Sequence, residues 1–174
     1  LALFTSKNIE YTTAHLDAVD QNVQLTDVAS DSREVTPGSL FVCKGAHFSP
    51  AYLASAVEAG AVAYLCEQSI ATELQAVAPN VAAICVDDVR LAMAYAAAGV
   101  AGHPDKKLTT IGITGTKGKS TCSYMLRAIL DGDEPYSKCG VIGGIEVFDG
   151  KDTQPAHNTT PEAPELWRHL KHAA

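Results

Sequence analysis

Residues 108–129 read LTTIGITGTKGKSTCSYMLRAI and contain the residue types that hold a phosphate group. A β-branched run leads into a glycine turn, and Lys119 and Ser120 open an amphipathic helical pattern. Backbone N–H groups of such a turn converge on an anion, the helix N-terminus adds its positive end, and the lysine adds a mobile charge. The strict P-loop places glycine where this chain has Ile113, whereas Gly115 lies two residues later. The pattern predicts a phosphate-binding loop of irregular spacing, with Ser120 placed for magnesium.

The composition is typical of a globular protein. The 174 residues are 47% hydrophobic and 19% charged, which separates the chain from disordered tails. Its formal net charge of −7 argues against a general nucleic-acid binder, whose surface would be basic. No apolar stretch approaches the roughly 20 residues that span a bilayer. We therefore expect neither a nucleic-acid partner nor a membrane partner.

The cysteines and the N-terminal residues indicate the cellular compartment of the protein. The five cysteines form no Cys-x-x-Cys pair, and three of them fall in or beside apolar runs, so we expect buried free thiols in a reducing compartment. No secretion signal is evident in the first ten residues, and the predicted location is the cytoplasm. Since the sequence starts at Leu1, we expect that it lacks its first residues.

The chain up to residue 102 alternates between strand-like and helix-like segments. After a weak strand signal at 22–29, we expect strands at 39–44, 62–66 and 81–86 and helices at 51–60, 69–78 and from Asp87 or Asp88 to about 102. This alternation predicts a small α/β domain with a largely parallel sheet. The polar segment 103–107 then resembles a linker, so the predicted domains are 1–105 and 106–174.

The second domain is expected to start with a strand at 108–114 and a helix that buries an apolar stripe. That stripe comprises Cys122, Met125, Leu126, Ile129 and Leu130. A strand at 138–142 would then lie parallel to the first, and a hairpin would turn at Asp149-Gly150. A final helix would be capped by a threonine, with Pro161 in its first turn. Two parallel strands do not complete a sheet, so we expect the biological protein to be much longer.

Four separated motifs together resemble the Mur ligase family, specifically the MurE-type UDP-N-acetylmuramoyl-L-alanyl-D-glutamate ligases. They are Asp31-Ser32-Arg33 with PGSLFV at 37–42, Gly60-Ala61 before a strand, TGTKGKST at 114–121 and Asn158-Thr159-Thr160-Pro161. The third motif shares the family's departure from strict P-loop spacing. The fourth favours the MurE branch over the related MurF, MurC and folylpolyglutamate enzymes.

The resemblance implies a small N-terminal uridine-nucleotide-binding α/β domain, followed by the truncated start of a P-loop parallel-sheet domain. It implies a ligase that uses ATP and Mg²⁺ to activate the carboxylate of UDP-muramoyl dipeptide as an acyl phosphate, which an amino acid then attacks. Lys119 would act on the phosphate charge as the catalytic residue, Ser120 would bind Mg²⁺, and Ser32 would bind the uridine diphosphate. The nucleotide-binding residues would be Gly115, Thr116, Lys117, Gly118, Lys119, Ser120 and Thr121, and Asn158, Thr159 and Thr160 would orient the muramoyl peptide.

Several points depart from the family or stay open. Lys117 stands where asparagine is frequent, and Lys44 and His47 are candidate sugar or uracil contacts as well as ordinary loop residues. The family's magnesium-binding glutamate, its carbamylated lysine and its amino-acid domain would follow Ala174, so we expect the chain alone to be inactive and the third amino acid to be undetermined. We also expect the protein to be a monomer. The alternatives are another Mur-type ligase, a P-loop kinase or GTPase, and a non-catalytic nucleotide or UDP-sugar-binding module.

Overall fold

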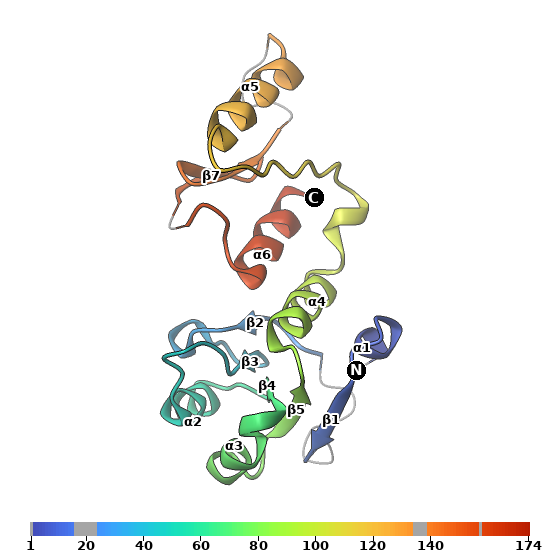
Figure 1. The fold of residues 1–174 in the computed structure, drawn as a ribbon, viewed down its shortest axis with the longest axis vertical. Helices are drawn as coiled ribbons and strands as arrows, with labels where there is room; N and C mark the ends of the chain where they lie inside the picture. The colour runs from blue at the N-terminus through green and yellow to red at the C-terminus, as the bar shows by residue number, and fades with distance from the viewer. Residues whose placement is uncertain (1, 16–23, 134–138, 157) are drawn as a thin grey trace. The chain divides into compact units, whose positions relative to one another are not determined.

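The computed structural model describes residues 2–15, 24–133, 139–156 and 158–174. The chain divides into two compact units, Leu1–Ala101 and Gly102–Ala174. The division lies a few residues before the boundary predicted at 105/106. No helix in the described ranges is long and apolar enough to cross a membrane. Each unit has its own sheet, and the two are described in turn (Figure 1).

The first unit is built on a five-stranded sheet with the order β1-β5-β4-β3-β2. Its strands are β1 (Tyr11–Ala14), β2 (Val28–Ala29), β3 (Leu40–Val42), β4 (Ala63–Glu67) and β5 (Ala82–Val86). Strands β2 to β5 are parallel, and β1 runs antiparallel to β5. The predicted parallel α/β unit is therefore confirmed. Of the weak strand signal at 22–29, only β2 forms a strand within the described residues.

Helices cover both faces of this sheet. They are α1 (Ala2–Ser6), α2 (Pro50–Glu58), α3 (Ala71–Val77) and α4 (Val89–Ala101), with short 3₁₀ turns η2 (Ser32–Glu34) and η3 (Gln68–Ile70). The Ser49 hydroxyl accepts a hydrogen bond from the Ala51 N–H at the start of α2, and the Asp88 carboxylate accepts one from the Leu91 N–H in α4. Helices α2 and α3 share a core with alternate strand residues, and α4 contacts β2, β4 and β5.

The second unit combines a small antiparallel sheet with two longer helices (Figure 1). Its elements are η4 (Pro104–Lys106), α5 (Lys119–Asp131), β6 (Val141–Ile142), β7 (Glu146–Phe148), β8 (Thr153–Pro155) and α6 (Ala163–Ala173). The sheet order is β6-β7-β8, and both pairings are antiparallel. The predicted hairpin is confirmed, because Gly150 with φ +95° lies in the turn between β7 and β8.

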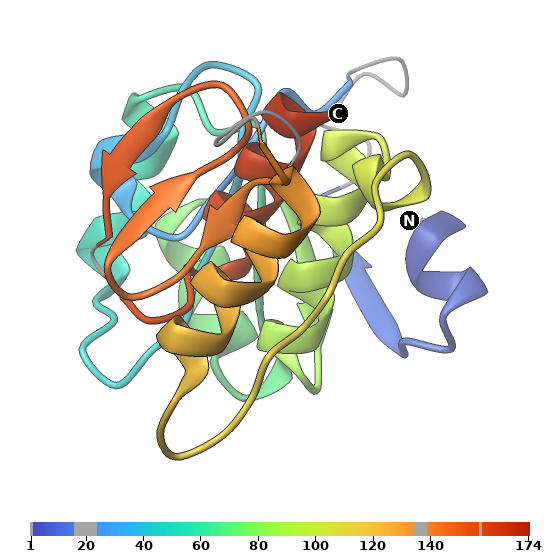
Figure 2. The same cartoon turned by 90° about the horizontal axis from the view of Figure 1, so that it is seen from above.

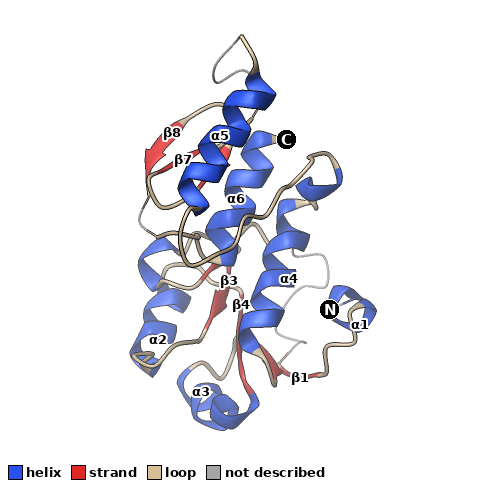
Figure 3. Cartoon of the chain, turned by 45° about the horizontal axis from the view of Figure 1, so that its top comes forward, coloured by secondary structure: helices blue, strands red, loops and turns tan. Residues whose placement is uncertain are grey.

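The predicted strand at 108–114 is wrong. Figure 3 shows this stretch as a loop, and Figure 2 shows it running as a long connection from η4 to α5. Its Ile111 side chain is 57% exposed, and no described strand pairs with the stretch. The predicted parallel neighbour at 138–142 is wrong as well, because β6 pairs antiparallel with β7. A segment with strand propensity forms a strand only when a neighbouring strand is present to share its hydrogen bonds.

The predicted apolar core stripe of α5 is also wrong. Met125 is 62% exposed and Ile129 is 73% exposed, whereas Arg127 and Asp131 on the same helix are buried. The helix therefore packs through its polar face. The periodicity shows correctly which face of α5 is apolar. However, the β6–β7 hairpin contacts the polar face, where Glu146 interacts with Tyr124 and Arg127.

The start of α6 differs from the prediction too. Glu162 occupies the N-cap position without a side-chain cap hydrogen bond, and Pro164, rather than Pro161, lies in the first turn. The three residues at 158–160 precede the helix as an exposed bend. The threonine cap is therefore absent, and this segment keeps its polar side chains available on the surface.

Candidate functional site

The glycine loop ends where α5 begins. Gly118 is the N-cap residue and has φ +80°, a left-handed conformation that glycine adopts without strain. Among the described residues no side chain caps the first turn of α5, so its backbone N–H groups are donors for an anion. The Lys119 ammonium donates a 2.7 Å hydrogen bond to the Gly115 carbonyl oxygen. The arrangement places a lysine and a helix N-terminus at one exposed turn.

The other residues predicted for nucleotide binding lie in or beside this turn. Thr116, Lys117 and Thr121 are exposed, and Ser120 is partly exposed on the first turn of α5. All of the predicted nucleotide-binding positions are thus on one surface-accessible segment. The structure shows that these positions are accessible, and their roles in nucleotide binding remain predictions.

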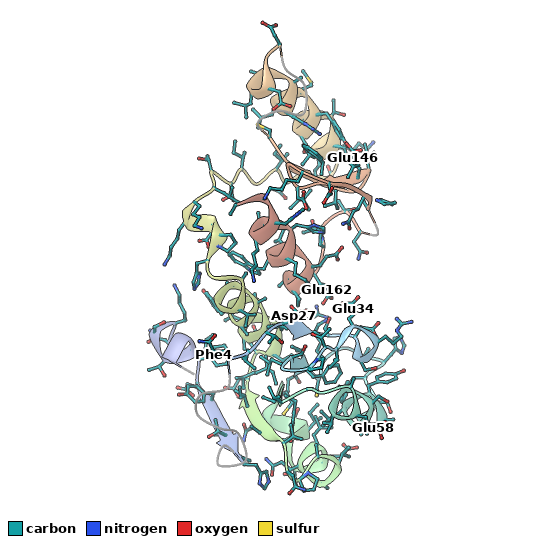
Figure 4. All side chains as sticks on the ribbon, turned by 180° about the vertical axis from the view of Figure 1, so that it is seen from behind. Phe4, Asp27, Glu34, Glu58, Glu146 and Glu162 are labelled. Atoms are coloured by element: carbon teal, nitrogen blue, oxygen red, sulfur yellow. The ribbon has the colours of Figure 1, made fainter. Side chains whose placement is uncertain are left out.

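A buried polar network fixes the helix that follows the loop. The Tyr124 hydroxyl donates a 2.9 Å hydrogen bond to Glu146 Oε1 on β7, a residue labelled in Figure 4. Arg127 Nε lies 3.3 Å from Asp131 Oδ2, and the guanidinium stacks 4.3 Å from the centre of the Phe148 ring. Because α5 is attached by directed polar contacts, its N-terminus and the loop are held in one orientation.

The same hairpin also touches the segment predicted to orient the muramoyl peptide. Gly144, between β6 and β7, approaches this segment so closely that a Cβ placed on it would lie 3.4 Å from the Thr159 Cα. Asn158, Thr159 and Thr160 are all exposed. One hairpin therefore contacts both the helix after the loop and the 158–160 segment. Neither Gly144 nor Glu146 could be predicted to make these contacts, because no sequence motif marks either residue.

Ser32 lies in the first unit, in the η2 turn that follows β2. The neighbouring Asp31 carboxylate accepts a 2.9 Å hydrogen bond from the Arg33 N–H and forms a 2.5 Å ion pair with the Arg33 guanidinium. The side-chain hydrogen bond from Arg33, followed by the backbone one, lowers the pKa of Asp31 to about 2. The contacts between Asp31 and Arg33 thus stabilise the turn that carries Ser32. This turn lies at the carboxyl edge of the sheet, where α/β folds bind ligands.

Lys44 and His47 lie beyond the carboxyl end of β3 at the same sheet edge. Lys44 is partly buried and His47 is exposed. Their assignment as ligand contacts therefore remains a prediction alongside the ordinary loop interpretation.

A second cluster joins α6 to the β7–β8 turn. Asp149 is 4% exposed, and its Oδ2 lies 2.7 Å from His172 Nδ1 and 3.7 Å from His169 Nδ1. Burial would raise the pKa of Asp149, but the N–H of Asp152, the His172 ring and the N–H of Lys151 together lower it to about 2. No grouping of acidic, histidine and cysteine side chains in the described ranges is suited to a metal ion. We interpret the cluster as structural.

Three curated relatives align with most of this chain. The 2,6-diaminopimelate-adding UDP-N-acetylmuramoyl-L-alanyl-D-glutamate ligase of Clostridioides difficile is 36% identical over 151 residues, which is 86% of this chain and 30% of that protein. The UDP-N-acetylmuramyl-tripeptide synthetase of Latilactobacillus sakei is 37% identical over 157 residues, 88% of this chain and 29% of its own length. The diaminopimelate ligase of Caldanaerobacter subterraneus is 38% identical over 147 residues, which is 83% of this chain and 29% of that protein.

The chain belongs to the Mur ligase family. It spans about a third of the length of these curated relatives, and they are of the MurE type. No protein-family model matches the chain.

Solved structures support the same fold. A diaminopimelate-adding ligase of this kind gives a TM-score of 0.60 at 19% identity, covering 94% of this chain and 34% of that one. MurF from Acinetobacter baumannii gives a TM-score of 0.52 at 27% identity, covering 74% of this chain and 26% of that one. The first likeness concerns the fold alone, and the second agrees with the family assignment.

Proposed function

We propose that this Mur family chain is the substrate- and nucleotide-binding part of an ATP-dependent ligase. The ligase adds the third amino acid to UDP-N-acetylmuramoyl-L-alanyl-D-glutamate through an acyl phosphate, in the cytoplasmic synthesis of peptidoglycan precursors. The observation that carries the proposal is the GTKGKST loop at the uncapped start of α5, within a sequence that is 36% identical to a MurE-type ligase over 86% of its length.

The two units receive different tasks in this proposal. Residues 1–105 bind the uridine-diphosphate part of the substrate, with Ser32 in the η2 turn as the contact residue. Residues 106–174 begin the ATP-binding domain. Asn158, Thr159 and Thr160 orient the muramoyl peptide, and their contact with the β6–β7 turn through Gly144 supports a fixed position for this segment.

The chemistry of the loop suits a nucleotide with magnesium. Bound MgATP would supply the phosphoryl group that activates the substrate carboxylate. The N–H groups at the start of α5 hold phosphate oxygens, and Lys119 exchanges its Gly115 carbonyl partner for a phosphate, which is a stronger charged acceptor. The partly exposed Ser120 hydroxyl fits a single Mg²⁺ ligand, because Mg²⁺ in nucleotide sites takes most of its ligands from phosphate and water. Lys117 adds a second exposed charge within the loop.

Phosphate release tests this function. The ligase is expected to release phosphate only when ATP, UDP-muramoyl dipeptide and an amino acid are all present, in a protein that continues this chain to the length of its relatives. The 174-residue chain alone is expected to release none, because it spans only about 30% of the length of the ligases it resembles. If this chain alone released phosphate in a reaction that needs both UDP-muramoyl dipeptide and the amino acid, the proposal that it is only the binding part of the ligase would be wrong. Substrate-independent hydrolysis of GTP by either protein would instead favour a GTPase.

A further inference from the structure

Three cysteine thiols gather in the core of the first unit, on the face that α2 and α3 cover. Cys43, Cys66 and Cys85 are all buried and all belong to one cluster that also contains Tyr64. The Cys66 and Cys85 sulfur atoms lie 3.7 Å apart, in van der Waals contact. None of these thiols has a part in the proposed ligase function.

The backbone allows Cys66 and Cys85 to bond. They are direct partners in the parallel pairing of β4 with β5. Neighbouring strands lie about 4.8 Å apart, inside the roughly 4.4–6.8 Å Cα separation that disulfides span. The two sulfur atoms therefore need only side-chain rotation and a small approach to reach bonding distance.

One of the two cysteines borders an opening in the surface. Cys85 is among the residues that line an open cavity of about 720 Å³, together with Tyr11, Thr12, Gln68 and Asp87. Burial raises the pKa of the Cys66 thiol, so Cys66 itself reacts poorly with a peroxide. Cys85 is only 2% exposed, but it is the member of the pair that borders this cavity, so an oxidant that enters there reaches Cys85 before Cys66.

We propose that Cys66 and Cys85 are a reversible oxidation site that closes to a disulfide in the presence of a hydroperoxide. In the first step the Cys85 sulfur attacks hydrogen peroxide, the O–O bond breaks, and Cys85 sulfenic acid and water form. In the second step the Cys66 sulfur attacks the sulfenic sulfur. The S–O bond breaks, the S–S bond forms, and hydroxide leaves with the Cys66 proton as water. Two thiols are oxidised, one peroxide is reduced, and a dithiol reductant reverses the bond.

Peptide mapping of the peroxide-treated folded chain tests this site. The Cys122→Ser/Cys139→Ser variant removes the two thiols of the second unit. In this variant we expect a mass lower by two hydrogen atoms, the loss of two free thiols, and one link between the peptides of Cys66 and Cys85. Dithiothreitol should restore both thiols. A Cys43→Ala substitution in the same background should leave the link unchanged.

Two further measurements distinguish a site from inert core thiols. With Cys66→Ala, Cys85 should accumulate as a sulfenic acid that a 1,3-diketone traps, whereas Cys85→Ala should leave Cys66 reduced. In the unsubstituted chain the exposed Cys122 serves as a positive control for the oxidant. The proposal is wrong if Cys122 is oxidised while Cys66 and Cys85 both remain thiols in the folded protein. A link that involves Cys43 instead would also overturn it.

Discussion

The Lys119 ammonium lies 2.7 Å from the Gly115 carbonyl oxygen and closes the glycine turn onto the start of α5. Through this hydrogen bond the lysine stays within the turn where a phosphate would bind. The contact is replaceable, since both groups are at the surface and a phosphate oxygen is a stronger acceptor than a neutral carbonyl. Among the described residues, the loop thus holds the Lys119 cation through a backbone carbonyl and not through a partner side chain.

Removal of the Lys119 charge should weaken ATP binding. We expect Lys119→Met to raise the dissociation constant by about tenfold or more, because a charge-assisted hydrogen bond contributes on the order of 1.5–3 kcal/mol. Calorimetric titration of the chain with MgATP measures the change. Lys106→Met, on the exposed turn η4, removes the same charge away from the loop and should leave the constant unchanged. Equal effects of the two substitutions would assign the loss to net charge alone.

The Asp149 carboxylate should stabilise the second unit in a defined pH range. Its pKa is lowered to about 2 in the folded protein, below the usual value near 3.9, so its contribution is complete above about pH 4 and is lost as the pH falls toward 2. Asp149→Asn should therefore cost about 2 kcal/mol at neutral pH, and the difference from the unsubstituted chain should narrow between pH 4 and pH 2.

The fluorescence of Trp167 during urea unfolding measures this effect, because Trp167 is the sole tryptophan and lies on α6. Asp133→Asn provides an exposed control with the same change in charge. A pH-independent difference between Asp149→Asn and the unsubstituted chain would contradict the assignment.

The inverted orientation of α5 gives opposite expectations for two neighbouring residues. Arg127→Met should destabilise the second unit by about 3 kcal/mol, because it leaves the Asp131 carboxylate buried without its guanidinium partner at 3.3 Å. Ile129→Ala should change stability by no more than about 0.5 kcal/mol, because the side chain is 73% exposed. Urea unfolding followed at Trp167 compares them. A large loss for Ile129→Ala would restore the predicted apolar core stripe.

Tyr64 offers a test of the first unit. Its side chain is fully buried, and its hydroxyl has no hydrogen-bond partner among the described residues. Tyr64→Phe should therefore be neutral or stabilise the unit by up to about 1 kcal/mol, since a buried hydroxyl without a partner carries a desolvation cost. Leu53→Ala should instead cost about 2–5 kcal/mol by leaving a cavity. Far-UV circular dichroism during urea unfolding measures both. A loss above 1 kcal/mol for Tyr64→Phe would show that the hydroxyl is hydrogen-bonded.

The first unit could be predicted well from sequence because its signals are local. Each apolar run is short and bounded by turn residues, and strands β3, β4 and β5 pair within one compact stretch of chain. The second unit could not be predicted to the same degree. The β-branched run before the loop has strand propensity, but a strand forms only where a neighbour offers its ladder. Similarly, periodicity shows which face of α5 is apolar and does not show what lies opposite.

The candidate site also has a part that local sequence signals predict and a part that they do not. The loop residues can be predicted because glycine, lysine and a helix start follow one another in sequence, and family motifs predict roles for Ser32 and Thr159. The contact of Gly144 with Thr159 and the pairing of Asp149 with His172 join segments far apart in the chain. No spacing rule connects them, so only the folded structure brings them together.

Titration of UDP-N-acetylmuramoyl-L-alanyl-D-glutamate into this chain tests the central claim most directly. Calorimetry should show saturable binding at one site, weakened about tenfold by Ser32→Ala through the loss of a hydrogen bond to a charged diphosphate. Ser55→Ala, an exposed position on α2, should leave the affinity unchanged. Absence of binding by the folded chain, together with binding of GTP, would contradict the assignment to a MurE-type ligase function.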